Sequence, residues 1–442
     1  KNIVSMNNKK IFFWSISVAL SGFLFGFDTV VISGANLPIR ELWNTSPLFH
    51  GVFIMSMALW GTVIGALLGS YPCDKLGRKK TLVVIGLLFL VSAVGSALAW
   101  DPYSFSFFRF IGGLGVGASS VASPTYISEI SNKENRGRLV ALYQFNIVLG
   151  ILIAYFSNYL LQGFGGDIDW RFMLGIEAIP SIFFLLSIIK IPESPRWLIL
   201  FANKDKKAKE ILNIMYDGKG VDNKVLEIRK GFNDNNQSLF SKPFFTQLKL
   251  AFLISFFNQL SGINFVLYYA PQILESAGFG TSDSLMSSIS IGFINLLFTL
   301  LGVRLIDSFG RKFLMYVGSF GYIISLISIG SCFLLELNSN ILLTFILLFV
   351  ASHAIGQGAV IWVFISEIFP NSVRAKGQSF GSGIHWVFAA IITAITPYVI
   401  DLLGNNPGLI FFFFGLMMIF QLIFVYRTMP ETRKTSLEKM KL

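Results

Sequence analysis

The sequence predicts an all-α membrane protein with twelve membrane-spanning helices in two related halves of six. Three observations carry this prediction. Of the 442 residues, 54% are hydrophobic and only 13% are charged, which is about half of the charged fraction of a soluble domain. Apolar stretches of spanning length recur along the whole chain, and three motifs occur twice at nearly the same offset. This composition excludes a soluble enzyme, a disordered scaffold and a disulfide-stapled secreted domain.

Twelve apolar segments are long enough to cross a bilayer as helices, which takes about 20 residues. Transmembrane β-strands are about 10 residues long and alternate in polarity, and these segments show neither property. No cleavable signal pattern precedes the first segment, so we expect it to be retained as a helix. The segments lie near residues 11–34, 49–73, 81–100, 104–130, 137–161, 170–191, 245–276, 283–306, 313–335, 341–369, 377–402 and 407–427.

Lysine and arginine are distributed unevenly between the two sides of the predicted membrane. All but three of the 35 basic residues lie in the termini and in every second loop; the exceptions are Arg40, Arg109 and Arg171. The positive-inside rule makes this side the cytoplasm, so we expect a multi-pass protein of the cell membrane with both termini in the cytoplasm. The formal net charge of +11 therefore reports orientation in the lipid bilayer, and it indicates no nucleic-acid partner.

The segment 195–244 differs from the rest of the chain because it is rich in Lys, Asp, Asn and Glu. Its apolar residues recur at helical spacing, as in 204–212, which predicts amphipathic helices at the cytoplasmic surface. A solvated linker is the alternative, and we favour a small helical bundle. The chain is thereby divided into an N-terminal six-helix half (1–194), an intracellular helical linker (195–244) and a C-terminal six-helix half with a short cytoplasmic tail (245–442).

Three motifs of the first half return in the second half, which indicates an internal duplication. Parallel repeats of six spans are typical of transporters whose halves rock around a central site. The corresponding pairs are Asp74–Lys79 and Asp307–Lys312, Ile127–Ile130 and Ile365–Ile368, and Pro192–Ser194 and Pro430–Thr432.

Three further stretches add to these motifs: Pro192–Arg196, Phe257–Asn264 and Trp362–Pro370. Together they make the chain resemble the sugar porter branch of the major facilitator superfamily along essentially its whole length. The Asp-x-x-Gly-Arg-Lys loops mark the superfamily, whereas Pro-Glu-Ser-Pro-Arg and Gln-x-x-Gly-Ile-Asn are specific to sugar porters. The resemblance implies the major facilitator fold and alternating-access transport of a monosaccharide, either a hexose or a pentose. We expect no cofactor, no metal and a functional monomer.

A few charged residues lie well inside predicted spans, where an ionisable group is a candidate functional site. Asp28 in the first span and Arg109 in the fourth both fall in the outer half of the membrane, so we expect them to form an ion pair. A purely structural pair is the alternative. In the sugar porters that this chain resembles, an aspartate at this position accompanies proton coupling, while facilitators tend to carry asparagine. The resemblance therefore implies that Asp28 and Arg109 couple transport to protons.

Sugars are bound by uncharged hydrogen-bonding groups and by flat aromatic faces, and such residues lie at mid-membrane in several spans. Gly262 stands between two of them, Gln259 and Asn264, and we expect it to let that helix bend or unwind. Amide contacts that only hold helices together are the alternative role. By the resemblance, the sugar ligands are Gln144, Gln259, Asn264, Tyr268, Asn295, Trp362 and Trp386, with Phe25 lining the same cavity.

Three positions of the expected sugar site depart from the usual family pattern. Asn258 stands where glutamine is usual, and His385 stands where asparagine or glutamine is usual. Ile151 stands where the proton-coupled xylose transporter has glutamine, so the chain resembles glucose facilitators at that position. We expect His385 to be a neutral partner of a sugar hydroxyl, with a second titrating group as the alternative.

Charged motifs at the cytoplasmic helix ends are predicted to form a gate. Opposite charges on facing halves are expected to form salt bridges that hold while the cavity is open outward and break when it opens inward. A salt-bridge network that exists in only one state biases the equilibrium between the outward-open and inward-open states, even though each exposed bridge is weak. Glu177 in the sixth span matches a family glutamate whose role is left open. The gate residues are Asp74, Arg78, Glu129, Arg136, Glu193, Asp307, Arg311, Glu367, Arg374 and Glu431.

The sequence contains no catalytic constellation and no ATP-binding motif, so an enzyme is not expected. Gly113–Ala118 matches a dinucleotide fingerprint, but it lies inside an apolar span without a βαβ context, and we expect it to pack helices, as we do for Gly61, Gly65 and Gly69. Two alternatives to a symporter remain. One is a facilitative sugar uniporter, against which Asp28 argues, and the other is a non-transporting sugar receptor, which would carry a long cytoplasmic tail.

Overall fold

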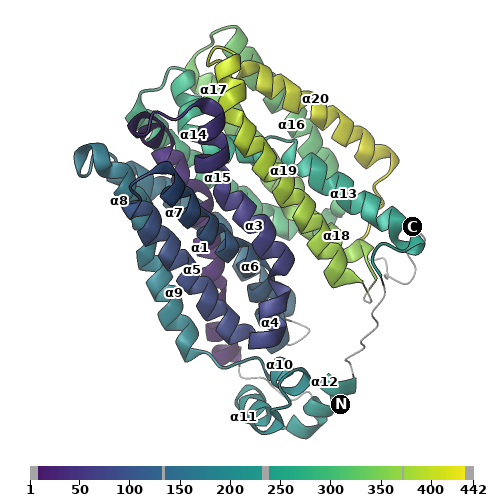
Figure 1. Cartoon of the computed structure of the whole chain (residues 1–442). Coiled ribbons are helices and arrows are strands. Elements are labelled where there is room, and N and C mark those ends of the chain that lie inside the picture. Colours follow the sequence, from purple (N-terminus) through teal and green to yellow (C-terminus); the bar gives the residue numbers. More distant parts are fainter. Residues whose placement is uncertain (1–7, 132–134, 231–237, 371–372, 434–442) are drawn as a thin grey trace.

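Helices of membrane-spanning length make up most of the structure. The structure is a computed structural model, and it describes residues 8–131, 135–230, 238–370 and 373–433. Within these residues, twelve helical segments are long and apolar enough to cross a membrane, so the predicted number of spans is confirmed. In Figure 1 the helices of the first half, coloured purple to teal, and those of the second half, coloured green to yellow, form two bundles side by side.

The first six spans use residues 8–190, and two of them are assembled from several short helices. The helices are α1 (Asn8–Leu42), α2 (Pro47–Phe49), the π-helix η1 (His50–Met55), α3 (Met57–Leu68), α4 (Ser70–Leu76), α5 (Arg78–Leu98), α6 (Pro102–Ile130), α7 (Arg136–Leu161), the 3-10 helix η2 (Gly166–Ile168), α8 (Asp169–Gly175) and α9 (Ala178–Lys190). The second span combines α2, η1 and α3, and the sixth combines η2, α8 and α9.

The last six spans use residues 242–427. Their helices are the 3-10 helix η3 (Lys242–Phe244), α13 (Phe245–Gln259), α14 (Ile263–Ser276), α15 (Thr281–Phe309), α16 (Arg311–Leu334), α17 (Ser339–Ile355), α18 (Gln357–Ile368), α19 (Arg374–Leu402) and α20 (Gly408–Arg427). The seventh span combines η3, α13 and α14, and the tenth combines α17 and α18.

Three short helices lie between the halves: α10 (Pro195–Leu200), α11 (Asp205–Tyr216) and α12 (Val221–Lys230). They pack against one another, and Figure 1 shows them beyond one end of the bundles. α11 buries its apolar face, which includes Ile211, Leu212 and Met215. The segment therefore has the small helical bundle that its apolar spacing predicts, rather than a solvated linker.

The seventh and tenth spans are broken near their middles. Gly262 has φ +83°, which favours glycine, and a Cβ atom there would lie 2.4 Å from the ring of Phe414. The break that the sequence predicts at Gly262 is thus confirmed. The tenth span breaks at Gly356 between α17 and α18, where the backbone meets Gly318 of α16, and this break was not expected.

α3 and α6 pack with their backbones in direct contact, which explains their repeated glycines. A Cβ atom on Gly61 would lie 2.2 Å from the carbonyl oxygen of Phe110, and one on Gly113 would lie 1.9 Å from that of Ala58. Small residues let membrane helices approach in this way. The glycine run of the fourth span is therefore a packing surface, as expected, and not a dinucleotide site.

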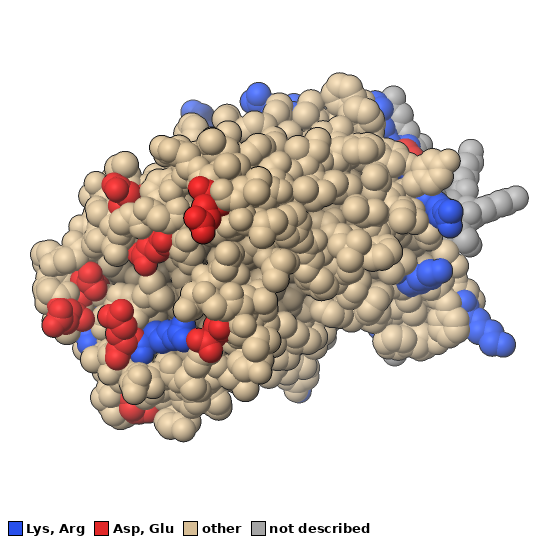
Figure 2. Space-filling view, turned by 90° about the horizontal axis from the view of Figure 1, so that it is seen from above, with Lys and Arg blue, Asp and Glu red and all other residues tan. Residues whose placement is uncertain are grey.

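Acidic and basic side chains lie at opposite ends of the molecule. Figure 2 shows Asp and Glu gathered at one end, with Lys and Arg predominating toward the other. We call these the acidic end, where Glu41, Asp101 and Asp283 lie, and the basic end, where Lys79 and Lys312 lie. Large apolar side chains are exposed between the two ends, as expected for a surface that faces lipid.

Candidate functional site

Four ring side chains from three helices meet at the boundary between the halves. His385 and Trp386 are neighbours on α19, with ring centroids 4.7 Å apart. The Trp362 ring on α18 lies 5.0 Å from that of His385, and the Phe25 ring on α1 lies 5.6 Å from that of Trp386. Because Phe25 belongs to the first half and the other three belong to the second, this aromatic cluster joins the two halves.

Three amide side chains at the break of the seventh span adjoin the aromatic cluster. Gln259 Nε2 lies 3.1 Å from His385 Nε2 and donates to Asn258 Oδ1 at 3.0 Å. Asn264 Nδ2 donates to Gln259 Oε1 at 2.8 Å. Residues five apart point in different directions on a regular helix, so the break at Gly262 is what brings Asn264 back to Gln259.

The combination of amides and rings suits a neutral ligand that carries several hydroxyl groups. Amides offer uncharged donors and acceptors, and ring faces pack against C–H surfaces. The buried indole Nε1 of Trp386 has no hydrogen-bond partner among the described residues. Since buried donors are normally paired, this N–H is available to a bound ligand.

Three other predicted ligands belong to α7 and α15, two helices that pack together across the halves. Gln144 and Ile151 belong to α7, and Asn295 belongs to α15. Ile151 and Asn295 are buried, and Gln144 is half-buried. Within the described residues, no hydrogen bond joins these side chains to the amides around Gln259, so the structure places them on the same boundary without linking them to that cluster.

A buried ion pair lies near the aromatic cluster, on the same helix as Phe25. Asp28 Oδ1 accepts a hydrogen bond from Arg109 Nη1 of α6 at 2.5 Å, and Arg109 Nη2 donates to the backbone oxygen of Asp28 at 3.0 Å. The two side chains are only 2% and 3% exposed. The pairing expected from their matched depth in the membrane is therefore present.

Glu177, whose role was left open, is a third ionisable group of this charged cluster. It lies between α8 and α9, is buried, and is close enough to interact electrostatically with Asp28 and Arg109. Its Oε1 atom has no hydrogen-bond partner among the described residues. Two ionised carboxylates and one guanidinium leave one negative charge uncompensated, and burial disfavours such a charge, so the cluster has a place for a proton. The signal that singled out Asp28, a charge inside a span, applies equally to Glu177.

Tyr268 of α14 connects the amide region to the charged cluster. It lies one turn after Asn264, and its hydroxyl is near the side chains of Asp28, Arg109 and Thr29, the residue that follows Asp28. Tyr268 belongs to the second half and Thr29 to the first. A relative movement of the halves therefore changes the surroundings of Asp28.

The charged motif of the first half forms a compact network at the basic end. Arg78 Nη2 and Nε donate to the two carboxylate oxygens of Glu129 at 2.8 and 2.9 Å, and Arg78 Nη1 donates to Asp74 Oδ1 at 3.1 Å. The guanidinium and the Glu129 carboxylate are buried, with side chains 6% and 8% exposed. Bidentate pairing of this kind is the stronger form of an Arg–carboxylate contact.

The second half repeats this network with nearly the same geometry. Arg311 Nη2 and Nε donate to Glu367 at 2.7 and 3.0 Å, and Arg311 Nη1 donates to Asp307 at 3.2 Å. The Glu367 side chain is more exposed than that of Glu129, at 27%. The internal duplication thus extends from the sequence to individual hydrogen bonds.

Glu193 and Glu431 complete the two networks by capping helices of their own half. Glu193 accepts from the backbone N–H of Lys79 at the start of α5, at 3.0 Å, and Glu431 accepts from that of Lys312 at the start of α16, at 2.9 Å. Burial raises the pKa of Glu193, and the backbone N–H donors of Lys79 and Ser194 oppose that rise. A negative charge at a helix N-terminus is favourable.

The salt bridges that were predicted to join the halves while the cavity is open outward are not formed among the described residues, and they stay a prediction for the outward-open state. Every ion pair among the described residues lies within one half or within the linker. The reason is local: Arg78 and Arg311 each begin a helix and turn toward the neighbouring helix ends of the same half. Arg374 donates to the backbone oxygen of Phe369 at 3.3 Å, and the side chain of Arg136 lies outside the described residues.

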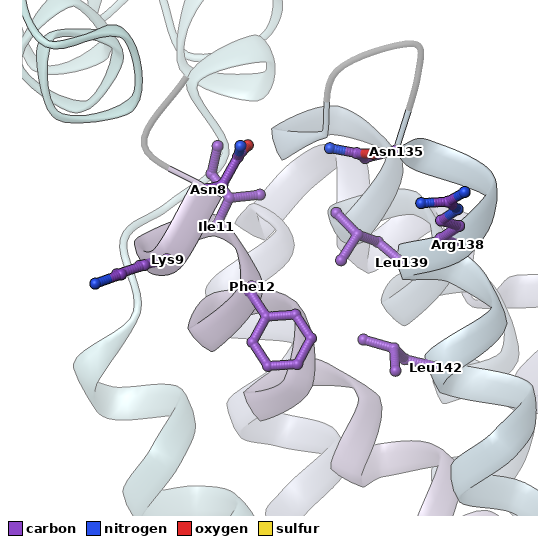
Figure 3. Close-up of a pocket in the computed structure, with 8 residues that line it drawn as sticks. All are labelled: Asn8, Lys9, Ile11, Phe12, Asn135, Arg138, Leu139 and Leu142. Carbon is purple, nitrogen blue, oxygen red and sulfur yellow. The ribbon is translucent and has the colours of Figure 1, made fainter. Parts of the chain in front are cut away.

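A separate cavity of about 490 Å³ lies at the basic end, between the first turns of α1 and α7. Figure 3 shows the Phe12 ring and the Leu142 side chain facing each other across it, with Lys9 and Arg138 toward the periphery. None of its lining residues belongs to the predicted sugar site. The cavity therefore does not mark that site.

Comparison with known proteins identifies a family. Residues 14–442 match the family model described as sugar (and other) transporter. The chain is 36% identical over 436 residues to the arabinose-proton symporter of Bacillus subtilis (strain 168), covering 96% of this chain and 93% of that protein. It is 32% identical over 475 residues to the D-xylose-proton symporter of Escherichia coli (strain K12), covering 98% of this chain and 96% of that protein.

Solved structures of the E. coli xylose transporter share this fold. Its partially occluded inward-open conformation has a TM-score of 0.85 and 32% identity, covering 97% of this chain and 100% of that chain. The same transporter bound to 6-bromo-6-deoxy-D-glucose has a TM-score of 0.79 and 31% identity, covering 98% of each chain. The present structure thus agrees better with the inward-open form than with the sugar-bound form.

Proposed function

Because this chain belongs to the sugar transporter family, we propose that it is a proton-coupled symporter, which moves a monosaccharide across the cell membrane by alternating access. The relatives named above carry arabinose or xylose with protons. The observation that carries the coupling proposal is the buried cluster of Asp28, Arg109 and Glu177. Burying ionisable groups inside a membrane is expensive, and such groups mark proton pathways.

The sugar is proposed to bind at the boundary between the halves, near the start of α14. Gln259, Asn264 and the Trp386 indole N–H supply neutral hydrogen-bonding groups, and the His385 ring adjoins them, with its two nitrogens 3.2 and 3.1 Å from Gln259 Nε2. Aromatic rings cover the C–H faces. The remaining members of the proposed site are Phe25, Gln144, Ile151, Asn258, Tyr268, Asn295 and Trp362.

The two halves, 1–194 and 245–442, are proposed to rock around this site as a monomer, with 195–244 joining them at the cytoplasmic surface. The basic end is assigned to the cytoplasm by the positive-inside rule, so both termini belong there. The charged networks around Arg78 and Arg311 are proposed to stiffen each half, so that the halves move as bodies and open or close the cytoplasmic side.

Proton coupling is tested with Asp28→Asn in proteoliposomes. The amide keeps a hydrogen-bonding group beside Arg109 but cannot bind and release a proton. We expect accumulation of labelled sugar against its gradient to disappear, while exchange of internal for external sugar continues. Exposed Asp167 at the acidic end provides the matched control, and Asp167→Asn should accumulate sugar as the parent does. Uphill accumulation by Asp28→Asn would overturn the coupling role.

A facilitative uniporter is the second candidate, favoured by Ile151, which resembles glucose facilitators. The two functions differ in one measurement. A pH gradient, acidic outside, should drive the parent protein to concentrate sugar in vesicles, and collapsing that gradient with a protonophore should abolish the accumulation. A uniporter would equilibrate the sugar identically with and without the gradient.

A further inference from the structure

Three buried polar residues extend the amide cluster of the sugar site into the second half. Asn258 Nδ2 donates to Gln357 Oε1 at 3.3 Å, and Gln357 Nε2 donates to Gln421 Oε1 at 2.7 Å. Gln421 Nε2 then donates to Ser319 Oγ at 2.9 Å. Gln357, Gln421 and Ser319 are each 0% exposed, so they lie behind the site rather than on its surface.

The six residues form one directional chain, which we call the amide chain: Asn264, Gln259, Asn258, Gln357, Gln421 and Ser319. In every link the amide nearer the sugar site donates and the amide farther from it accepts. Reversing one amide alone would bring two N–H groups or two oxygens together and leave buried polar groups unpaired. The amides are therefore held in a common orientation.

The amide chain connects the two broken spans. Asn258 lies in the last turn of α13, just before the break at Gly262, and Gln357 is the first residue of α18, just after the break at Gly356. Gln421 of α20 and Ser319 of α16 anchor Gln357 from behind. The contact between Asn258 and Gln357 thus fixes the broken end of one span against the broken end of the other.

This chain determines which atoms remain for a ligand. The two hydrogens of Gln259 Nε2 are directed to Asn258 and to the His385 ring, and Asn264 Nδ2 is directed to Gln259. Asn264 Oδ1 is consequently left as an acceptor, and Asn264 is the most exposed member of the amide chain, at 8%.

We propose that Gln357 is a positioning residue that sets the orientation of the Gln259 and Asn264 amides, and thereby the transporter's preference among sugar hydroxyl groups. The inference rests on the proposed sugar transport. Cutting the amide chain at Gln357 leaves Asn258 without its acceptor, so that Asn258, Gln259 and Asn264 are free to reverse together. A sugar hydroxyl that donates to Asn264 Oδ1 in the parent then meets an N–H group instead.

The test is equilibrium binding of monosaccharides to the purified full-length protein in detergent. The dissociation constants of the best-binding hexose or pentose and of each of its monodeoxy analogues are measured for the parent and for Gln357→Met, which keeps the length of the side chain without its hydrogen bonds. The hydroxyl penalty is the factor by which removal of one hydroxyl raises the dissociation constant. We expect the penalty for one particular hydroxyl to shrink by about 3- to 10-fold in the variant, because one neutral hydrogen bond to the sugar is lost. The other penalties should stay as in the parent.

Gln421→Met interrupts the same chain farther from the site and should change the penalty at the same hydroxyl. Asn158, a buried amide of α7 that donates to the Val31 backbone oxygen at 3.1 Å, provides the control: Asn158→Leu should lower thermal stability and leave all hydroxyl penalties unchanged. If both methionine variants bind every analogue with the parent's relative affinities, the positioning role is wrong. Failure of the parent to bind any monosaccharide would instead overturn the proposed function.

Discussion

Asn36 of the first half and Gln272 of the second half are joined by a hydrogen bond at the acidic end of the molecule, with Asn36 Nδ2 donating to Gln272 Oε1 at 2.8 Å. Asn36 Oδ1 lies 2.8 Å from His50 Nε2, and Thr45 Oγ1 lies 2.9 Å from His50 Nδ1. Asn36 and His50 are buried. The chain of contacts runs from the first two spans to the seventh, so it holds the halves together on the side opposite the basic networks.

Asn36→Ala should favour opening at the acidic end. The change removes the hydrogen bond between the halves and the contact of Asn36 with His50 Nε2, and one neutral hydrogen bond contributes about 0.5–1.5 kcal/mol. We expect the open population to rise by about 2- to 10-fold, measured as the distance between spin labels at Glu41→Cys and Asp283→Cys. Cys73 and Cys332 are buried, so background labelling is low.

The control for this measurement is Asn158→Ala, since Asn158 bonds within the first half. It should leave the distance distribution unchanged. An unchanged distribution in Asn36→Ala would mean that the Asn36–Gln272 contact does not hold the acidic end closed.

Glu177→Gln should uncouple sugar transport from protons, as Asp28→Asn is expected to do. The glutamine keeps the size and polarity of the side chain but removes one carboxyl, so the remaining Asp28–Arg109 pair is neutral without an added proton. We expect the accumulation ratio to fall at least about 10-fold, with sugar exchange retained. Glu336, exposed at the acidic end, supplies the control Glu336→Gln. If the Glu177→Gln variant accumulates sugar as the parent protein does, Glu177 has only a structural role.

Arg78→Ala should destabilise the protein more than the equivalent Arg311→Ala. Removing Arg78 leaves the Glu129 carboxylate buried and unpaired, which costs about 3–5 kcal/mol. Glu367 is more exposed, so water replaces part of the lost contact. The check is thermal unfolding of both variants in detergent. Arg78→Lys should be little more stable than Arg78→Ala, because lysine lacks the bidentate fork. Equal losses of stability in Arg78→Ala and Arg311→Ala would contradict this account.

His385→Asn should change sugar affinity without moving the pH profile of transport. His385 contacts Gln259 and lies between the rings of Trp362 and Trp386, at interplanar angles of 56° and 82°, in the region proposed to bind the sugar. Rates measured from pH 5.5 to pH 8 should keep the shape of the parent's profile, while KM rises by about 3- to 10-fold. Loss of one limb of the profile would show instead that His385 titrates during transport.

Much of the fold follows from local patterns and was therefore predictable. The number of spans follows from hydropathy, and the break at Gly262 follows from a glycine placed between two polar residues. The break at Gly356 was not predicted, although the polar residues His353 and Gln357 stand on either side of that glycine in the sequence. That break depends on the backbone of Gly318, which approaches from another helix.

The candidate site was predictable in its residue types but only partly in its contacts. The Asp28–Arg109 pair was expected from matching depth alone. Arg78 and Arg311 were grouped with Glu129 and Glu367, but the pairing of these side chains within each half was not predicted, since the sequence does not show which way a side chain turns at a helix start. Glu177 satisfied the same criterion as Asp28, but its contact with Asp28 depends on how the sixth span packs against the first.

The sequence by itself determined the membrane environment, the twelve spans and the duplication of the two halves, and it predicts the orientation of the spans. These properties are sums over short stretches of chain, such as the hydropathy of about 20 residues or the charge of a loop. The tertiary structure alone decided which polar groups meet. The hydrogen bonds that join Asn258, Gln259, Gln357 and Gln421 to their distant partners connect residues 64 to 126 positions apart. A hydrogen bond requires atoms within about 3 Å of each other, and only the packing of the broken helices brings these amides that close.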